Sequence, residues 1–360
     1  MKSIKNHFND IKSKGVKIIF EKILNLLNTY TLRFFKKFIF IVYLGFVFSS
    51  LYKKETRPLN TKKILFVSSV WGKKFEDCFI KFTLSSLLAT KNIPLLLQQD
   101  YKIKFIISIV PNSDFENTII NKINSIISSE KYEIEFFYYE KMSISMMHKY
   151  QIKMFEKSID ENAIIWPAHP DHCYSNGSIS NMISMIDSDD CCIGAPIFRV
   201  EEDKFMQDIK VSNFLNSTPK EFINTSIKNF HKSLVNSFID NELNNSWLTG
   251  ISVKKIGSNN LLVTFIVPNI FAARLNKSDI KFFKKRTYNA YDMSWPSKLL
   301  IEKRLRLVSA SDIFFAAELT NKDNHIDYNF TKNFNPRKDY KRNLHSGIIG
   351  SFTYFINCSK

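Results

Sequence analysis

Glycine-rich phosphate and nucleophile motifs are missing from this sequence. Only 9 of its 360 residues are glycine, and none of the patterns GxxxxGK[ST], GxGxxG or GxSxG occurs. Each pattern uses glycine to let a backbone turn tightly around a phosphate or to present a nucleophile. Their absence argues against phosphate-loop kinases, dehydrogenases with the usual dinucleotide fingerprint, and α/β-hydrolases with the usual nucleophile elbow.

Cysteine is also scarce, and its pattern does not suit a disulfide framework. The five cysteines are an odd number and include the adjacent pair Cys191 and Cys192. We therefore expect reduced thiols in a reducing compartment. A secretory signal peptide is not expected either, because the basic region before the first apolar run is too long and no small-x-small cleavage site follows it.

Positive charge is concentrated at the N-terminus. The chain carries 51 Lys and Arg against 34 Asp and Glu, a net charge of +17, and residues 1–63 alone hold +11 of it. No RNA- or DNA-binding module is recognisable, and the charge lies beside an apolar run, which suits anionic lipid better than nucleic acid. We therefore expect a membrane surface as partner, and no nucleic acid.

The apolar run is FIFIVYLGFVFSSLY, residues 38–52, and lysines flank it on both sides. As a helix it would be about 22 Å long, short of the roughly 30 Å of a bilayer core, although lysines can snorkel. A short span, a re-entrant segment and an in-plane anchor all remain open. The preceding stretch has Ile and Leu at helical spacing between lysines, as a membrane-surface helix does; the alternative is a buried helix packed on the folded domain.

From residue 61 onward, strand and helix patterns alternate. Expected strands lie at 61–69, 102–110, 132–139, 162–168 and 191–200, and expected helices at 75–89, 115–128, 143–159, 178–186 and 222–239. Such alternation predicts an α/β fold with a mainly parallel sheet flanked by helices, in which ligands bind at the carboxyl ends of the strands.

Asp171 is placed for chemistry in this arrangement, because it follows the fourth strand and precedes the fourth helix. Mg²⁺ and Mn²⁺ prefer hard oxygen ligands, and one carboxylate together with phosphate oxygens supplies them. A turn or helix-capping role is the alternative. His169 and His172 bracket Asp171, but no third ligand is near in sequence, which argues against zinc.

Other polar side chains are expected in the same crevice, for stacking, hydrogen bonding or offsetting phosphate charge, although Ser or Asp at such places often only caps a helix. These positions are Ser68, Ser69, Trp71, Gly72, Lys73 and Lys74 after the first strand, Asp114 after the second, and Arg199 after the fifth.

The richest acidic cluster is expected to lie elsewhere. Asp187, Asp189 and Asp190 follow a helix and precede a strand, which puts them at the amino end of the sheet, in a solvated turn. In the second half of the chain the acids to watch are Asp292, in NAYDMSW, and Asp312, which follows Ser309 and Ser311. Asp292 is our candidate for a general base that takes a proton from an attacking hydroxyl.

Three stretches together resemble a group of bacterial glycosyltransferase-like proteins with the GT-A fold. They are ILFVSSVWGKKFEDCFIKFTLSSLLATKNIPLL, FIISIVPNSD and IIWPAHPDHCYSNGSISNM. The family's Pro-Asp and Ser-x-Gly-Ser motif is matched at Pro170, Asp171, Ser175, Gly177 and Ser178. A looser similarity covers Tyr291, Asp292 and residues 307–319.

The resemblance implies transfer of a sugar from a nucleotide-sugar donor to a surface polysaccharide or glycolipid, at the cytoplasmic face of the inner membrane. In that scheme, Asp171 orients the donor diphosphate, with Mg²⁺ or Mn²⁺ as a possible cofactor, and Ser68, Ser69, Trp71, Asp114 and Arg199 contact the donor. The usual Asp-x-Asp is replaced by His-Pro-Asp, so dependence on metal stays open.

Four regions follow from this scheme: a basic, apolar membrane-associated segment (1–60), a nucleotide-sugar-binding α/β domain (61–200), an acceptor-side part (201–325) and a C-terminal tail (326–360). The alternative function is a non-catalytic membrane-peripheral binding or scaffold protein that keeps the transferase fold.

Overall fold

The computed structural model describes most of the chain from residue 61 onward. The described residues are 61–139, 144–186, 191–209, 217–236, 238, 251–256, 260–265, 268–285, 295–323 and 352–357. They belong to one compact unit, Glu55–Lys360. The expected membrane segment, the acidic cluster at 187–190 and the candidate base Asp292 lie outside the described residues. None of the described helices is long and apolar enough to span a bilayer.

Strands and helices alternate through the first half of the described chain. The strands are β1 (Lys63–Ser69), β2 (Lys102–Ile109), β3 (Tyr132–Tyr138), β4 (Ile164–Pro167), β5 (His172–Tyr174), β6 (Cys192–Ala195), β7 (Phe198–Glu201), β8 (Ile251–Ile256), β9 (Asn260–Phe265), β10 (Asn269–Ala273), β11 (Leu305–Leu307), β12 (Ala316–Thr320) and β13 (Phe352–Asn357). The α-helices are α4 (Gly72–Cys78), α5 (Leu84–Leu87), α6 (Ile93–Gln98), α7 (Ser113–Asn124), α8 (Ile144–Asp160), α9 (Ser178–Ser184), α10 (Glu202–Asp208), α12 (Pro219–Lys228), α13 (Lys232–Val235), α15 (Lys277–Lys284) and α16 (Trp295–Ile301). A π-helical segment, η1 (Phe79–Thr83), joins α4 to α5, and a short 3₁₀ turn, η2 (Ser129–Lys131), precedes β3.

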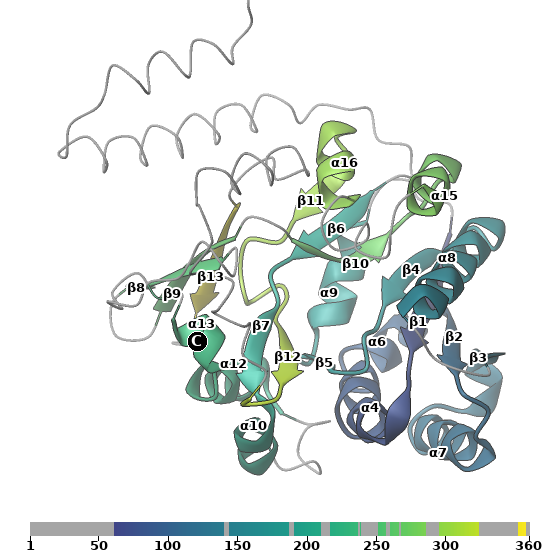
Figure 1. Ribbon diagram of the computed structural model, residues 1–360, viewed down its shortest axis with the longest axis horizontal. Coiled ribbons are helices and arrows are strands. Elements are labelled where there is room, and N and C mark those ends of the chain that lie inside the picture. Colours follow the sequence, from purple (N-terminus) through teal and green to yellow (C-terminus); the bar gives the residue numbers. More distant parts are fainter. Residues whose placement is uncertain are drawn as a thin grey trace, which may run out of the picture. The chain divides into compact units, whose positions relative to one another are not determined.

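The central sheet is mainly parallel, as the alternation predicts. Its seven strands run in the order β11-β6-β10-β4-β1-β2-β3, which can be followed in Figure 1. Strands β1 to β4 pair in parallel, and β11 pairs in parallel with β6, whereas β10 is antiparallel to both of its neighbours. The described residues thus form the expected α/β architecture, a mainly parallel sheet flanked by helices.

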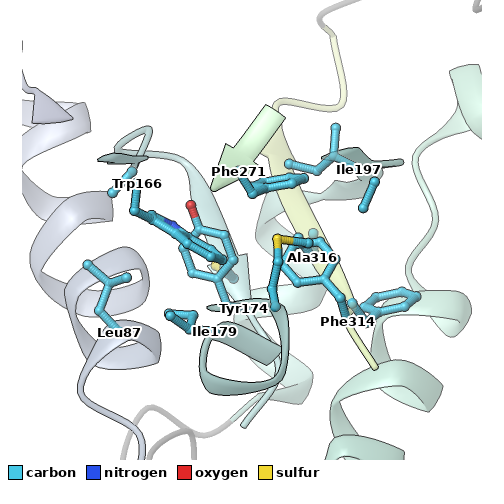
Figure 2. Packing of buried hydrophobic residues seen from close by; sticks show 14 of the residues in the cluster. Leu87, Trp166, Tyr174, Ile179, Ile197, Phe271, Phe314 and Ala316 are labelled. Atoms are coloured by element: carbon cyan, nitrogen blue, oxygen red, sulfur yellow. The ribbon is translucent and has the colours of Figure 1, made fainter. Parts of the chain in front are cut away.

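Strands β1, β2 and β4 are buried on both faces, which explains why they read as nearly continuous apolar runs. Alternate residues of β1 point to opposite faces. Ile64 and Phe66 belong to one hydrophobic cluster together with residues of η1, α5 and α9. Leu65 and Val67 belong to a second cluster together with residues of α8, α15 and α16. In the first cluster Trp166 and Tyr174 lie side by side (Figure 2), with ring centroids 5.5 Å apart.

The expected fifth strand, 191–200, is two strands in different sheets. β6 joins the central sheet, while β7 joins a second sheet of order β5-β12-β7. Pro196 lies between them and has no N–H to continue a ladder. This break moves Arg199, which we expected after a strand of the central sheet, into the second sheet. A third sheet has the order β13-β9-β8.

The expected helix at 222–239 is likewise interrupted. α12 ends at Lys228 and α13 starts at Lys232, and the backbone between them turns so that the His231 side chain accepts a hydrogen bond from the Ser233 N–H at 3.2 Å. The helical spacing of the apolar residues therefore does not give one continuous helix, because a side-chain cap starts a new helix at this point.

Candidate functional site

The carboxyl ends of β1 to β4 meet at one edge of the central sheet, and polar side chains gather there. The hydroxyls of Ser69 and Ser108 lie 2.7 Å apart, and the Tyr139 hydroxyl donates to the backbone oxygen of Val70 at 2.6 Å. Ser69 is therefore already engaged in holding β1 to β2. Ser68 is buried, and its hydroxyl has no hydrogen-bond partner among the described residues.

The turn after β1 has the conformation that its Trp-Gly sequence suggests. Gly72 has φ of +76°, a left-handed conformation that glycine adopts without strain, and Trp71 just before it packs on Phe75 with ring centroids 5.0 Å apart. Lys73 pairs with Asp77 at 3.1 Å and is largely exposed. The indole is the part of this turn that could stack on a nucleotide base.

Asp114 lies in the first turn of α7, after β2, with its side chain exposed. Asn112, not Asp114, caps the helix: its side chain accepts from the Phe115 N–H at 3.2 Å. A carboxylate at this place favours the helix through the macrodipole. A nucleotide contact by Asp114 stays a prediction.

Asp171 lies between β4 and β5 and faces residues of the second sheet. Its backbone oxygen accepts from the Leu319 N–H at 2.8 Å, which ties the segment to β12. On β12, Glu318 is the register partner of both His172 on β5 and Arg199 on β7. The Arg199 Nε lies 3.3 Å from Glu318 Oε1, and His172 Nε2 lies 3.9 Å from Asp171 Oδ1. The structure therefore brings two of the predicted residues, Asp171 and Arg199, into one cluster.

Withdrawal from bulk water dominates the electrostatics of Asp171, although its side chain keeps 28% of its surface exposed. Removal from water, and next the negative charge of Glu318, raise its pKa to about 7, although Arg199 acts in the opposite direction. Burial and the neighbouring His169 lower the pKa of His172 well below its usual value, so its ring is neutral near pH 7. Near neutral pH, Asp171 is thus poised between its charged and its protonated form.

A second ion pair borders the cluster at the start of α10. Glu202 receives the Lys74 ammonium at 2.7 Å and the Cys78 thiol at 3.5 Å. Burial and the adjacent Glu202 raise the pKa of Cys78 to about 12, so this thiol stays protonated and is a poor nucleophile. Of the lysines expected to offset phosphate charge, Lys74 is therefore already paired with a carboxylate.

The Ser-x-Gly-Ser part of the family motif proves to be structural. Ser175 and Ser178 share a hydrogen bond of 2.6 Å, and the Ser178 hydroxyl accepts from the Phe315 N–H at 2.9 Å. Gly177 has φ of +95° and immediately precedes α9. The buried Asn92 side chain accepts from the N–H groups of Gly177 and Ile179 at 2.9 and 3.0 Å. These contacts fix the turn after β5 against β12 and against the loop before α6.

The cluster offers few ligands to a metal. Among the described residues, no group of three His, Cys, Asp or Glu side chains could hold an ion. The rings of His169 and His172 lie 4.7 Å apart, without a third ligand of this kind. Mg²⁺ is often bound by one or two carboxylates plus substrate phosphates. Asp171 fits a cation only in that manner, with the phosphates of a donor supplying the other oxygens.

Sequence reasoning missed Glu318 and Glu202. Glu318 is the one acid in the strand AAELT, at a half-buried position between apolar neighbours, and that pattern could have marked it. The Ser311 hydroxyl, one of the groups we watched, accepts from the Asn357 N–H at 3.0 Å, so it holds β13, while Asp312 is exposed.

Comparisons with known proteins add little to this geometry. No protein-family model matches the chain, and no curated protein matches it by sequence. One solved structure that is similar is the mannosyltransferase PcManGT from Pyrobaculum calidifontis in complex with GDP-Man and Mn2+. The match has 9% sequence identity and a TM-score of 0.36, and it covers 85% of this chain and 75% of that one.

Proposed function

We propose that this chain is a glycosyltransferase, moving a sugar from a nucleotide-sugar donor to a surface glycan or glycolipid acceptor. The observation that carries the proposal is the Asp171 cluster at the carboxyl edge of a mainly parallel sheet, where ligands of open α/β folds bind. The left-handed turn at Gly72 and the Trp71 ring lie after β1 at the same edge and offer a surface for a nucleotide base.

In the proposed reaction an acceptor hydroxyl forms a bond to the anomeric carbon of the donor sugar, and the bond from that carbon to the nucleoside diphosphate breaks. A carboxylate takes the proton of the attacking hydroxyl; Asp292 remains our candidate for this role. Asp171 orients the diphosphate, and Ser68, Ser69, Trp71 and Asp114 contact the nucleotide. A bound Mg²⁺ or Mn²⁺ would neutralise charge that develops on the leaving diphosphate.

The basic and apolar residues 1–60 support a second part of the proposal. We infer that they hold the enzyme on anionic lipid at the cytoplasmic face of a bacterial inner membrane, near a glycan or lipid-linked acceptor. Binding of the full chain to vesicles containing phosphatidylglycerol, but not to neutral vesicles or to oligonucleotides, is the expected result. Equal binding to oligonucleotides would contradict it.

One observation favours a non-catalytic binding or scaffold protein of the same fold. Asp171 stands where the family has two acids, and the described residues contain no three-ligand group for a metal. Such a protein would bind membrane and show no response to nucleotide sugars.

Thermal unfolding of the full chain separates these readings. A ligand that binds only the folded state raises the midpoint of unfolding. We expect one class of nucleoside diphosphate and its sugar conjugates to raise it, and Asp171→Ala to abolish the shift, while Asp208→Ala, which alters an ion pair between α10 and α12, leaves it intact. No shift with UDP, GDP or CMP compounds, with or without Mn²⁺, would refute the transferase proposal.

A further inference from the structure

We propose that the Arg199–Glu318 pair binds hydroxyl groups of the sugar part of the donor, and not its diphosphate. The inference rests on the proposed transferase function and assigns a role to Glu318, which sequence reasoning did not single out. It also revises the role expected for Arg199, that of offsetting phosphate charge.

Geometry places the pair within reach of a ligand at Asp171. Glu318 is opposite Arg199 in the parallel β7–β12 ladder and opposite His172 in the antiparallel β5–β12 ladder. Residues paired across neighbouring strands point to the same face of a sheet. The side chains of Arg199, Glu318 and Asp171 are 37%, 22% and 28% exposed, so each is partly held by the fold and partly open to solvent.

Charge argues against a diphosphate at this pair. The Arg199 guanidinium is 3.3 Å from the Glu318 carboxylate, and Lys74, whose charge interacts with Asp171, is 2.7 Å from Glu202. Both Glu318 and Glu202 raise the pKa of Asp171, so both lie close enough for their charges to be felt there. A diphosphate placed directly against Arg199 would meet the repulsion of these carboxylates, and the Glu318 carboxylate already offsets the charge of Arg199. At Asp171, a bound Mg²⁺ or Mn²⁺ would offset the same repulsion, so the diphosphate is assigned there and not to the Arg199–Glu318 pair.

Hydrogen-bonding capacity argues for sugar hydroxyls. A carboxylate accepts hydrogen bonds only, and a guanidinium donates five in a fixed fork, whereas each hydroxyl both donates and accepts. Two adjacent hydroxyls of a sugar ring can therefore donate to Glu318 and accept from Arg199 without disturbing the charge balance of the pair. A neutral polyol suits this mixed pair, and the ladder positions of both residues fix their spacing.

The test compares each nucleotide sugar with its own nucleoside diphosphate. Dissociation constants of the full chain are measured by calorimetry for UDP, GDP, and their glucose, galactose, mannose and N-acetylglucosamine conjugates. The variants are Glu318→Gln, which keeps the shape but lacks the charge, and Arg199→Lys, which keeps the charge but lacks the fork. Lys228→Gln, which removes an exposed ion pair to Asp208, is the control.

We expect both variants to weaken binding of the preferred nucleotide sugar roughly tenfold, as for loss of a hydrogen bond to a charged group. Binding of the matching diphosphate should stay within about twofold of wild type, since the pair is not expected to touch it. The inference would be overturned if Arg199→Lys weakened binding of the diphosphate and of its sugar conjugate equally, or if neither variant changed binding of either ligand. Those results would leave the proposed transferase function standing. If wild type binds no nucleotide and no nucleotide sugar, the proposed function itself fails.

Discussion

Asn92 is the residue whose loss should most clearly test how the site is held. It is fully buried, its amide nitrogen donates to the backbone oxygens of Ser86 and Ser175 at 2.7 and 3.2 Å, and its oxygen accepts from two backbone N–H groups at the start of α9. One side chain thus joins the loop before α6 to the turn that follows Asp171 and β5.

Asn92→Ala would leave those two buried N–H groups without an acceptor. An unsatisfied buried group costs about 1–3 kcal/mol, and each lost hydrogen bond about 1 kcal/mol. We expect the free energy of unfolding to fall by about 4 kcal/mol, a large part of the 5–15 kcal/mol typical of whole proteins. The measurement is urea denaturation of the full chain followed by fluorescence.

Asn176→Ala is the matched control on the same contact. The Asn176 side chain accepts a hydrogen bond from the Lys91 N–H at 2.8 Å at the solvent-exposed rim of this interface. In the variant, water can replace the lost acceptor. We expect a cost below about 1 kcal/mol there. Equal, small losses in both variants would refute the claim that Asn92 organises this turn.

Three further outcomes follow from the buried charges and rings. The pKa of Asp171 in the folded protein, about 7, exceeds its unfolded value of about 3.9, so the folded state binds more protons between these pH values and loses stability as pH rises. Urea titrations should therefore show that Asp171→Asn gains stability relative to wild type from about pH 4 to pH 7. A difference in stability that does not change with pH would contradict this. Burial opposes ionisation of Asp279, but the hydrogen bonds and the charge of Arg304 outweigh burial and lower the pKa of Asp279. The ionised carboxylate therefore stabilises the fold above about pH 4, and this stabilisation is lost as pH falls through the lowered pKa. Asp279→Asn should cost about 3–5 kcal/mol at pH 7 and progressively less in acid, because Arg304 loses its buried partner; a constant cost from pH 7 to pH 3 would be inconsistent with the ion pair. Trp166→Ala should lower the free energy of unfolding by about 3–5 kcal/mol, since the Trp166 ring is fully buried. Trp71→Ala, at the half-exposed turn, should lower it far less. Similar midpoints of urea unfolding for the two variants would show that the core is not packed as described.

The central sheet was within reach of sequence reasoning because its inner strands β1, β2 and β4 are buried on both faces. Short apolar runs such as ILFV in β1 and KIKFIISI in β2 are typical of buried strands, and helices separate them along the chain. The antiparallel β10 was not foreseen, since the order of strands depends on contacts between distant residues such as Ala273 and Ile165. Three-residue strands like β5 leave too short a pattern to detect.

The candidate site was predicted in part. Asp171 and Trp71 follow strands directly, so their position at the carboxyl edge came from topology alone. Glu318 could not be placed there, because its partners Arg199 and His172 come from strands 119 and 146 residues away, and only the ladder shows that they meet. The serines at 175 and 178, which match the family motif, have a structural role: their hydroxyls share a hydrogen bond, and the Ser178 hydroxyl also bonds to the backbone of Phe315.

Hydrogen exchange of the full chain with and without its preferred nucleotide sugar tests the central claim most directly. Slower exchange is expected for amides of residues 168–172, of β12, whose Leu319 N–H bonds to the Asp171 backbone oxygen, and of α4, whose Lys74 interacts with the Asp171 charge. Protection confined to the amino edge, where Lys63 and Lys104 pair with Glu161, or no protection with any nucleotide sugar, would contradict the account.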